Sequence, residues 1–517
     1  MSDSEKAFII TEESRKPERA ALVSAPPTQV QDVGSPNLTA ALSAGAQLKP
    51  LSIAAFKLYL VLLAACMGSL SFGFDSSVVT SVNGMKQFTD YFGISGGDTG
   101  GGQGATAALS YSLFSFGCIA GAPISAPISD RWGRRGGMLA GSITLLLGIS
   151  LVTAAQTRIY LLVGRFFIGA GSALNMVAAP AYVSELAPPQ AGVFHFLDIH
   201  HFHSAFNFIG SIVCSGVTVA TSRINSSLSW RIPFAIQFAP TIILAVGVCF
   251  IPESPRWLMS LGRKDEARNI LAKYHGNGDL NAPLVVLEYQ ELEASIKTIG
   301  TERKWWDYFN YLELFRSRSA RYRTFITCWM GICSLLSGTA IQYYSTVAFD
   351  LAGVKTQEAR ITTSFIQIAL TAVGALLGSL IVDKVGRRTL WLWGSASCAV
   401  TLGFAAGFTA RTDTKPAITF FLLFAFTQSL TYAPLQDGTE KQLSGVYAAE
   451  CLAFAARAKG IALVGLFESL AAVVDNFTGA LGFEAIGWKF ILVWAVWDVV
   501  ETIIIWLFAV ETKGRTL

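Results

Sequence analysis

The chain has 517 residues, of which 52% are hydrophobic and only 14% charged, with a mean hydropathy of +0.47 and a net charge of +4. Soluble domains carry about 25% charged residues, so this composition excludes an ordinary soluble domain and indicates a membrane protein. The small net charge does not by itself indicate a class of partner. We expect no nucleic-acid partner.

The first segment, residues 1–56, is rich in Ser, Ala and Pro and carries charges of both signs. Such a composition favours disorder, and we expect a disordered cytosolic tail. No cleavable signal peptide is visible, because the first apolar run begins only after this tail.

About twelve apolar runs follow, each near the length of about 20 residues that spans hydrocarbon. They centre near 58–79, 105–128, 138–155, 159–182, 203–222, 232–251, 324–348, 361–382, 389–408, 417–436, 459–482 and 489–509. In lipid, only helices and closed barrels satisfy the backbone polar groups. The sequence therefore predicts an all-α polytopic membrane protein with twelve transmembrane helices.

Basic residues collect in the loops after the second and eighth runs, before the eleventh run and at the end of the chain, whereas the alternate loops carry few. The positive-inside rule makes the basic side cytosolic. Both termini and the long loop 252–323 should then lie in the cytosol. Within that loop, residues 260–274 and 287–299 have the pattern of short amphipathic helices.

Two stretches nearly repeat, ISDRWGRRGG at 128–137 and IVDKVGRRTL at 381–390, and each follows the second span of a six-span group. Glu185, just after the fourth span, is echoed by Glu450 before the eleventh. We therefore expect two six-helix halves, as in transporters built from parallel repeats. The expected domains are the tail 1–56, the halves 57–251 and 324–510, the linker 252–323 between them, and a short cytosolic C-terminus, 511–517.

Several motifs in this order resemble the major facilitator superfamily, and within it the sugar porter family. They are DRWGRR (130–135), GRFFIGAG (164–171), PAYVSELAP (180–188), PESPRWL (252–258), DKVGRR (383–388) and ETKGR (511–515), over about 450 residues. TYAPLQ (431–436) and ECLAFAARAKG (450–460) look closest to fungal lactose and hexose permeases. The resemblance implies the major facilitator fold and alternating-access transport of a hexose or disaccharide, coupled to protons.

A carboxylate stands beside arginines at two cytosolic helix ends, and such pairs can latch helices in one state and release them in the other. Positive-inside topology alone explains the arginines but not the carboxylates. The expected cytosolic gating network comprises Asp130, Arg134, Arg135, Glu185, Glu253, Arg256, Asp383, Arg387, Arg388, Glu450 and Arg457.

We identify two ionisable residues within the apolar runs, Asp75 and Arg165. Charges inside a membrane are costly and mark pathways or ion relays. The resemblance implies that this first-span Asp pairs with the fourth-span Arg in proton-coupled members. A carboxylate that gains and loses a proton would then release and bind the Arg. A static structural pair is the alternative.

Sugars present hydroxyls and apolar ring faces, so amides and aromatic side chains on a central cavity are the candidates for binding. These are Gln342, Tyr343, Tyr344, Gln367, Asn207, Gln428, Tyr432 and Gln436. The seventh span departs from the family pattern, because Leu335 replaces the expected Gln and the expected Asn is missing or replaced by Thr339. Each candidate could instead make an interhelical hydrogen bond.

Four of the five histidines lie in VFHFLDIHHFHSAF, residues 193–206, a density that raises the question of a metal site. His200 and His203 could share one helix face, but ligation by the cluster would need an irregular backbone. We predict an interfacial cluster and no metal. The eight cysteines lie in or beside apolar runs and form no C-x-x-C pair, so we expect no disulfide frame and no cofactor.

The leading hypothesis is a proton-coupled sugar importer, a monomer in the plasma membrane. A sugar sensor that does not transport is a second hypothesis, although sensors of this kind have long cytosolic tails. An inactive paralogue is a third, because no Arg follows Glu185 at the usual place and because DGTEKQLSGVY (437–447) is an extra segment. We expect no enzyme, since no nucleophile–base or phosphate-loop motif is present.

Overall fold

We describe the protein from a computed structural model. It describes residues 53–94, 105–187, 199–299, 311–436, 451 and 457–511. The described residues form helices and no strands.

The first half of the chain forms α3 (Ile53–Val82), α4 (Lys86–Phe92), α5 (Ala105–Thr153), α6 (Arg158–Leu186), α7 (Ile199–Thr221), α8 (Leu228–Ile236) and α9 (Phe238–Phe250). The sequence predicts the second and third spans as separate helices. In the structure they form the single element α5, which bends at Gly133, where φ is 80°. Positive φ is accessible to glycine without the steric penalty that a Cβ brings, so Gly133 allows the chain to turn between spans without a loop.

A short helical linker follows, with α10 (Pro255–Ser260), α11 (Lys264–Tyr274), α12 (Pro283–Ile299) and the 3₁₀ turn η2 (Tyr311–Phe315). Ser254 caps α10 by accepting a hydrogen bond from the Trp257 N–H, with Pro255 in the first turn. Asp265 and Glu266 lie in the first turn of α11 and Lys273 in its last, which suits the helix dipole.

The second half comprises α13 (Arg318–Leu336), α14 (Thr339–Tyr343), α15 (Ser345–Leu351), α16 (Gln357–Val385), α17 (Arg387–Ala410), α18 (Thr414–Gln436), α20 (Arg457–Ile486) and α21 (Lys489–Phe508). The predicted seventh span is thus broken into α13, α14 and α15. Gly338 makes the first break, with φ 71°. Non-helical backbone at membrane depth is tolerated only inside the protein or on a cavity, and the residues after this break, Thr339 to Ile341, are buried.

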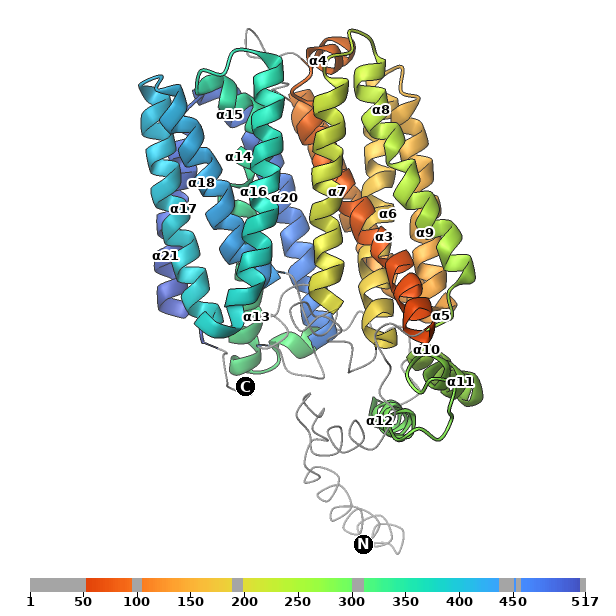
Figure 1. The fold of residues 1–517 in the computed structure, drawn as a ribbon. Helices are drawn as coiled ribbons and strands as arrows, with labels where there is room; N and C mark the ends of the chain where they lie inside the picture. The colour runs from red at the N-terminus through yellow and green to blue at the C-terminus, as the bar shows by residue number, and fades with distance from the viewer. Residues whose placement is uncertain are drawn as a thin grey trace, which may run out of the picture.

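Figure 1 shows two helical bundles side by side, with α10–α12 beside one end of the first bundle and α4 at the other. We call these the linker end and the α4 end. Among the residues that the structure describes, ten helices are long and apolar enough to cross a membrane. One of them, Ala107–Thr153, covers two predicted spans, and Ala205–Thr221 is a shorter apolar helix. The twelve-helix, all-α fold predicted from the sequence is confirmed.

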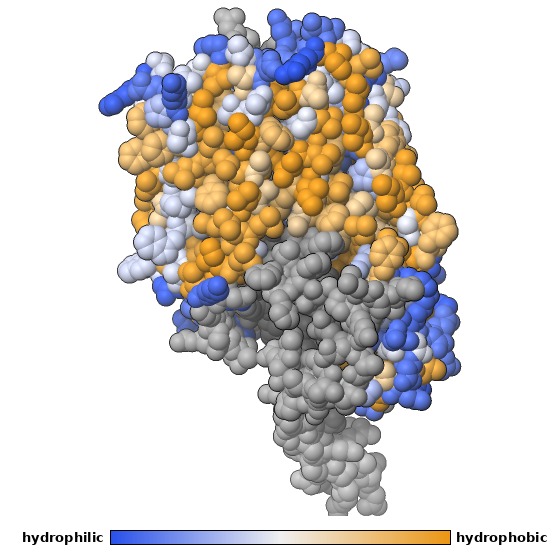
Figure 2. All heavy atoms as spheres, viewed as in Figure 1, coloured by the Kyte–Doolittle hydropathy of each residue, from blue (hydrophilic) through white to orange (hydrophobic). Residues whose placement is uncertain are grey.

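The outer surface is apolar over a broad band between the two ends (Figure 2). Large apolar side chains are exposed on the described helices, among them Phe250 (84%) and Ile159 (70%). A patch of this size on a soluble protein would aggregate, whereas a lipid bilayer covers it. The chain is therefore a multi-pass membrane protein.

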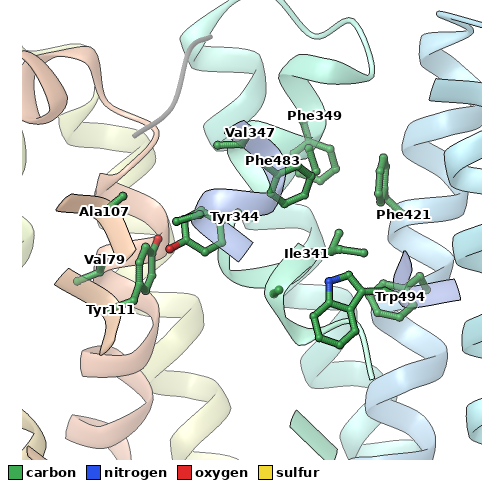
Figure 3. Close-up of a cluster of buried hydrophobic side chains, with 14 of the residues drawn as sticks. Val79, Ala107, Tyr111, Ile341, Tyr344, Val347, Phe349, Phe421, Phe483 and Trp494 are labelled. Carbon is green, nitrogen blue, oxygen red and sulfur yellow. The ribbon is translucent and has the colours of Figure 1, made fainter. Parts of the chain in front are cut away.

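Aromatic side chains fill the seam between the bundles near its centre. Tyr111 of α5 faces Tyr344, at the junction of α14 and α15, with ring centroids 4.9 Å apart, and Phe483 of α20 packs on the far side of Tyr344 (Figure 3). Tyr344 is fully buried and Tyr111 is 4% exposed. This aromatic layer joins the two halves and lies beside the residues considered next.

Candidate functional site

Polar contacts join the two halves at the α4 end. Arg223, after α7, forms an ion pair with Glu358 of α16 at 2.5 Å. Gln357 accepts a hydrogen bond from the Lys86 N–H and donates to Gln87 Oε1 and to the Ser222 carbonyl. The halves are thus held together at this end in the conformation described.

Asp75 and Arg165 lie next to each other in the interior of the first half, on α3 and α6. Asp75 is fully buried and Arg165 is 2% exposed. The Arg165 guanidinium donates to the backbone carbonyls of Asp75 (3.3 Å) and Ser110 (3.4 Å) and lies over the Phe114 ring. The Asp75 carboxylate accepts instead from Ser172 Oγ at 3.1 Å, and its Oδ1 has no partner. The two predicted residues are adjacent, but their charged groups do not form an ion pair within 4.0 Å.

The break in the seventh span presents a chain of amides. Gln342 Nε2 donates to Gln428 Oε1 of α18 at 2.9 Å, and Gln428 Nε2 donates to the Thr339 hydroxyl at 3.3 Å. Gln367 of α16 is 6% exposed, and its Oε1 has no hydrogen-bond partner. Three of the predicted sugar-binding amides therefore lie on α14, α16 and α18, and two of them contact each other.

The other predicted sugar-binding residues have different surroundings. Tyr343 accepts a hydrogen bond from the Tyr111 hydroxyl at its backbone carbonyl, and the Tyr344 hydroxyl donates to the Asn476 carbonyl. Tyr432 donates to Glu501 of α21. Asn207 packs its backbone against Gly73 of α3, and its Oδ1 has no partner. The Gln436 side chain lies outside the described residues.

The predicted gating residues of the first half form one cluster at the linker end. Arg134 donates to both carboxylate oxygens of Glu185, at 3.1 and 2.9 Å, and to Asp130 at 3.1 Å. Such a two-point contact is the strongest arginine–carboxylate arrangement. Ser254 Oγ donates to Glu185 as well. Arg134 thereby ties α5 to the end of α6 and to the start of the linker.

Glu253 completes this cluster by accepting hydrogen bonds from the backbone N–H groups of Arg134 and Arg135, after the bend at Gly133. Burial raises the pKa of Glu253 above its ordinary value, although these backbone hydrogen bonds favour its charged form. The Arg135 side chain donates to the carbonyls of Val248 and Cys249 at the end of α9. Arg256 has no ion-pair partner in the part of the chain that the structure describes.

The second half repeats this arrangement with a residue that sequence reasoning missed. Glu511 accepts from the N–H groups of Arg387 and Arg388, next to Gly386, whose φ is 96°. The Arg388 side chain donates to the Trp506 carbonyl. Glu511 belongs to the ETKGR motif, which follows the last span of the second half as PESPR follows the last span of the first. A comparison of the two motifs could have identified Glu511 as the counterpart of Glu253. The side chains of Asp383, Glu450 and Arg457 lie outside the described residues.

The statement that Asp75 and Arg165 are the ionisable residues within the spans is wrong. Four further carboxylates lie within the last two predicted apolar runs, 459–482 and 489–509: Glu468 and Asp475 on α20, and Asp498 and Glu501 on α21. Asp475, Asp498 and Glu501 are fully buried. Each is a single acidic residue inside an apolar run of the sequence, and none belongs to a family motif quoted above.

The histidine cluster contributes backbone to α7, which begins at Ile199, but the side chains of His200, His201 and His203 and all of His195 lie outside the described residues. The extra segment 437–447 lies outside them too. No group of three or more potential metal ligands is found among the residues that are described. The eight cysteines are free thiols.

Comparison with known proteins places the chain in a family. The model of the family described as "Sugar (and other) transporter" matches residues 61–517, nearly the whole chain. The chain therefore belongs to this family, the sugar porters of the major facilitator superfamily, and is a membrane transporter by class. The fold and motifs described above agree with this membership.

Individual relatives are distant but cover most of the chain. It is 28% identical to the high-affinity glucose transporter of Kluyveromyces lactis, over 89% of this chain and 84% of that one. It is 27% identical to the MFS-type transporter criB of Aspergillus cristatus, over 86% and 89%. Its fold is similar to a partially occluded inward-open structure of the xylose transporter XylE of E. coli, with a TM-score of 0.69 at 19% identity, over 89% and 99%.

Proposed function

We propose that this protein is a proton-coupled sugar transporter that carries a hexose or disaccharide across the plasma membrane by alternating access, and that it works as a monomer with both termini in the cytosol. The observation that carries the coupling is the buried Asp75 carboxylate beside Arg165. An uncompensated carboxylate in this interior is costly. Protonation relieves that cost, and deprotonation would draw Arg165 from the backbone carbonyls to the carboxylate.

The sugar site is assigned to the amides at the break of the seventh span. Gln342 and Gln428 are hydrogen-bonded to each other. Each amide also has a donor and an acceptor that could bind sugar hydroxyls. Gln367 offers an unpaired buried oxygen. Tyr343, half-buried beside Gln342, supplies the aromatic face that a sugar ring requires, and Tyr344, fully buried against Tyr111, supports it from behind. The name of the Kluyveromyces lactis relative, a high-affinity glucose transporter, supports a hexose.

The contacts at the α4 end support an inward-facing state. Arg223, Glu358 and Gln357 hold the halves together there. At the linker end, by contrast, the contacts around Arg134 join helices of the first half, and those around Glu511 join helices of the second half. With the linker end on the cytosolic side, transport would require the α4 end to open and the linker end to close. The similar E. coli protein is itself named a proton:xylose symporter.

The test is uptake by a yeast strain without its own sugar transporters, using labelled lactose, glucose, galactose and xylose. Surface labelling first establishes that the protein reaches the plasma membrane. We expect saturable uptake of at least one sugar, with alkalinisation of the medium when that sugar is added. Absence of uptake by surface-localised protein would contradict transport and favour a sensor or an inactive paralogue. Uptake without proton movement would indicate a uniporter.

A further inference from the structure

A second buried carboxylate lies on the opposite side of the seam from Asp75. Asp475 is in the middle of α20, which packs against α5 of the other half. It is fully buried, and neither of its carboxylate oxygens accepts a hydrogen bond. The Ala340 backbone N–H faces it without making a hydrogen bond of good geometry.

No positive charge compensates Asp475 among the described residues. The titratable groups that face it are Tyr343 and Tyr344, from α14 and its junction with α15, and both are neutral phenols. The nearest acid along its own helix is Glu468, two turns earlier. A lone ionised carboxylate in such an interior is strongly disfavoured, so Asp475 carries a proton in this conformation.

The aromatic layer connects this proton to the Asp75 site. Arg165 donates to the Ser110 carbonyl, next to Tyr111, whose hydroxyl donates to the Tyr343 carbonyl at 3.1 Å. The ring of Tyr111 faces that of Tyr344 (Figure 3), and the Tyr344 hydroxyl donates to the carbonyl of Asn476, the neighbour of Asp475. Three side chains, Arg165, Tyr111 and Tyr344, thus lie between the two carboxylates.

We propose that Asp475 is a second proton-binding residue, which takes up a proton from water when the halves part at the α4 end and holds it when the seam closes. The proton adds to a carboxylate oxygen of Asp475 on loading and leaves to water on release, with no other bond made or broken. This inference rests on the proposed alternating access. It predicts that each sugar is accompanied by two protons, one on Asp75 and one on Asp475.

The experiment measures accumulation of labelled D-glucose by proteoliposomes that contain the full-length protein. A gradient of one pH unit is imposed with the membrane potential held at zero. Each coupled proton contributes about tenfold accumulation per pH unit at equilibrium. We expect about 100-fold accumulation by wild type and about 10-fold by Asp475→Asn. Asp475→Glu should restore the wild-type value, and the exposed control Asp413→Asn should keep it.

Equal accumulation by Asp475→Asn and wild type would overturn the inference, as would accumulation driven by a sodium gradient at constant pH. If wild type exchanges glucose but never accumulates it, the proposed symport fails, and infrared difference spectra then decide the role of Asp475. A protonated-carboxyl band that changes on addition of glucose, and that Asp475→Asn lacks, supports a mobile proton. A band that is unchanged by glucose, or no band, overturns it. Asp475→Glu keeps the carboxylate and therefore tests the inference independently if Asp475→Asn does not fold.

Discussion

The guanidinium of Arg165 donates to the backbone carbonyl of Asp75 at 3.3 Å and leaves the carboxylate of the same residue to Ser172. The arginine is therefore held in place by neutral acceptors and by the Phe114 ring. In a direct ion pair, the same guanidinium would donate to the Asp75 carboxylate instead. Two alternative sets of partners for one arginine are what a proton-controlled switch requires.

Asp75→Asn should abolish accumulation of sugar against its gradient and leave counterflow active. Asn preserves the shape and the Ser172 contact but cannot exchange a proton. Accumulation driven by an imposed pH gradient and counterflow without one are compared in the same vesicles. Arg165→Leu should impair both, because it leaves the Asp75 carboxylate without any cation nearby. A variant Asp75→Asn that concentrates sugar as well as wild type does would make Asp75 structural only.

Gln428→Ala should raise the KM for sugar more than it lowers the maximal rate of transport. It removes one amide that we assign to the sugar and frees the other, Gln342, from its partner. The loss of about one hydrogen bond, about 0.5–1.5 kcal/mol, corresponds to an increase in KM of about 2- to 10-fold. The control Thr427→Ala, at a half-buried position one residue earlier on α18, should leave KM unchanged. An unchanged KM in Gln428→Ala, with a reduced rate, would instead assign Gln428 to helix packing.

Gly133→Ala and Gly386→Ala should each destabilise the protein. Both glycines have positive φ, and an added Cβ would come within 2.2 Å of Glu253 Oε2 and 2.8 Å of Glu511 Oε2 respectively. Backbone strain of this kind costs about 1–3 kcal/mol. Thermal unfolding in detergent measures the effect. Gly407→Ala, in the interior of α17 with open space around it, should be neutral or slightly stabilising. Equal melting temperatures for all three variants would exclude the turn-and-carboxylate arrangement.

His275 should make the attachment of the linker helices dependent on pH. The side chain is 4% exposed and bridges Glu288 of α12 (2.6 Å) and the Leu186 carbonyl at the end of α6 (3.0 Å). Burial lowers its pKa, but the Glu288 carboxylate and the hydrogen bond to the Leu186 carbonyl together outweigh this effect, so the pKa is raised above the ordinary 6.5.

Because the pKa is raised in the folded state, the stabilisation is complete below pH 6.5 and is lost as pH rises through the folded-state pKa. Hydrogen exchange of the α11 and α12 amides, measured from pH 6 upward and corrected for intrinsic rates, should show protection that falls in wild type. In His275→Gln that protection should be lower at pH 6 and insensitive to pH. A difference between the two proteins that grows with pH would contradict the assignment.

The Arg223–Glu358 pair should bias the conformational equilibrium only modestly. Its side chains are 70% and 58% exposed, and exposed pairs contribute about 0–1 kcal/mol. Arg223→Glu should alter the transport rate by at most a few-fold, and Arg223→Glu with Glu358→Arg should recover it. The exposed Arg411→Glu serves as a control for charge alone. Failure of the double variant to recover, with normal surface expression, would remove the pair from the gate.

The spans could be located from the sequence because lipid imposes a simple length and polarity requirement on every one of them. The repeat of DRWGRR and DKVGRR likewise located the two linker-end turns. The sequence also contained Glu511 within a recognised motif. Its position after the last span suggests equivalence to Glu253. The hydrogen bonds that both carboxylates accept from backbone N–H groups are visible only in the structure, because residue identity does not specify backbone geometry.

The sequence by itself determined that the protein is helical, crosses the membrane about twelve times and consists of two related halves, since hydrophobic run length and motif order act locally along the chain. The tertiary structure decided which polar groups meet. It turned Arg165 away from the Asp75 carboxylate, joined Gln342 to Gln428, and buried Asp475 behind Tyr344. Those outcomes depend on how helices distant in sequence rotate against one another, and a side chain's partner in a low-dielectric interior is set by that rotation.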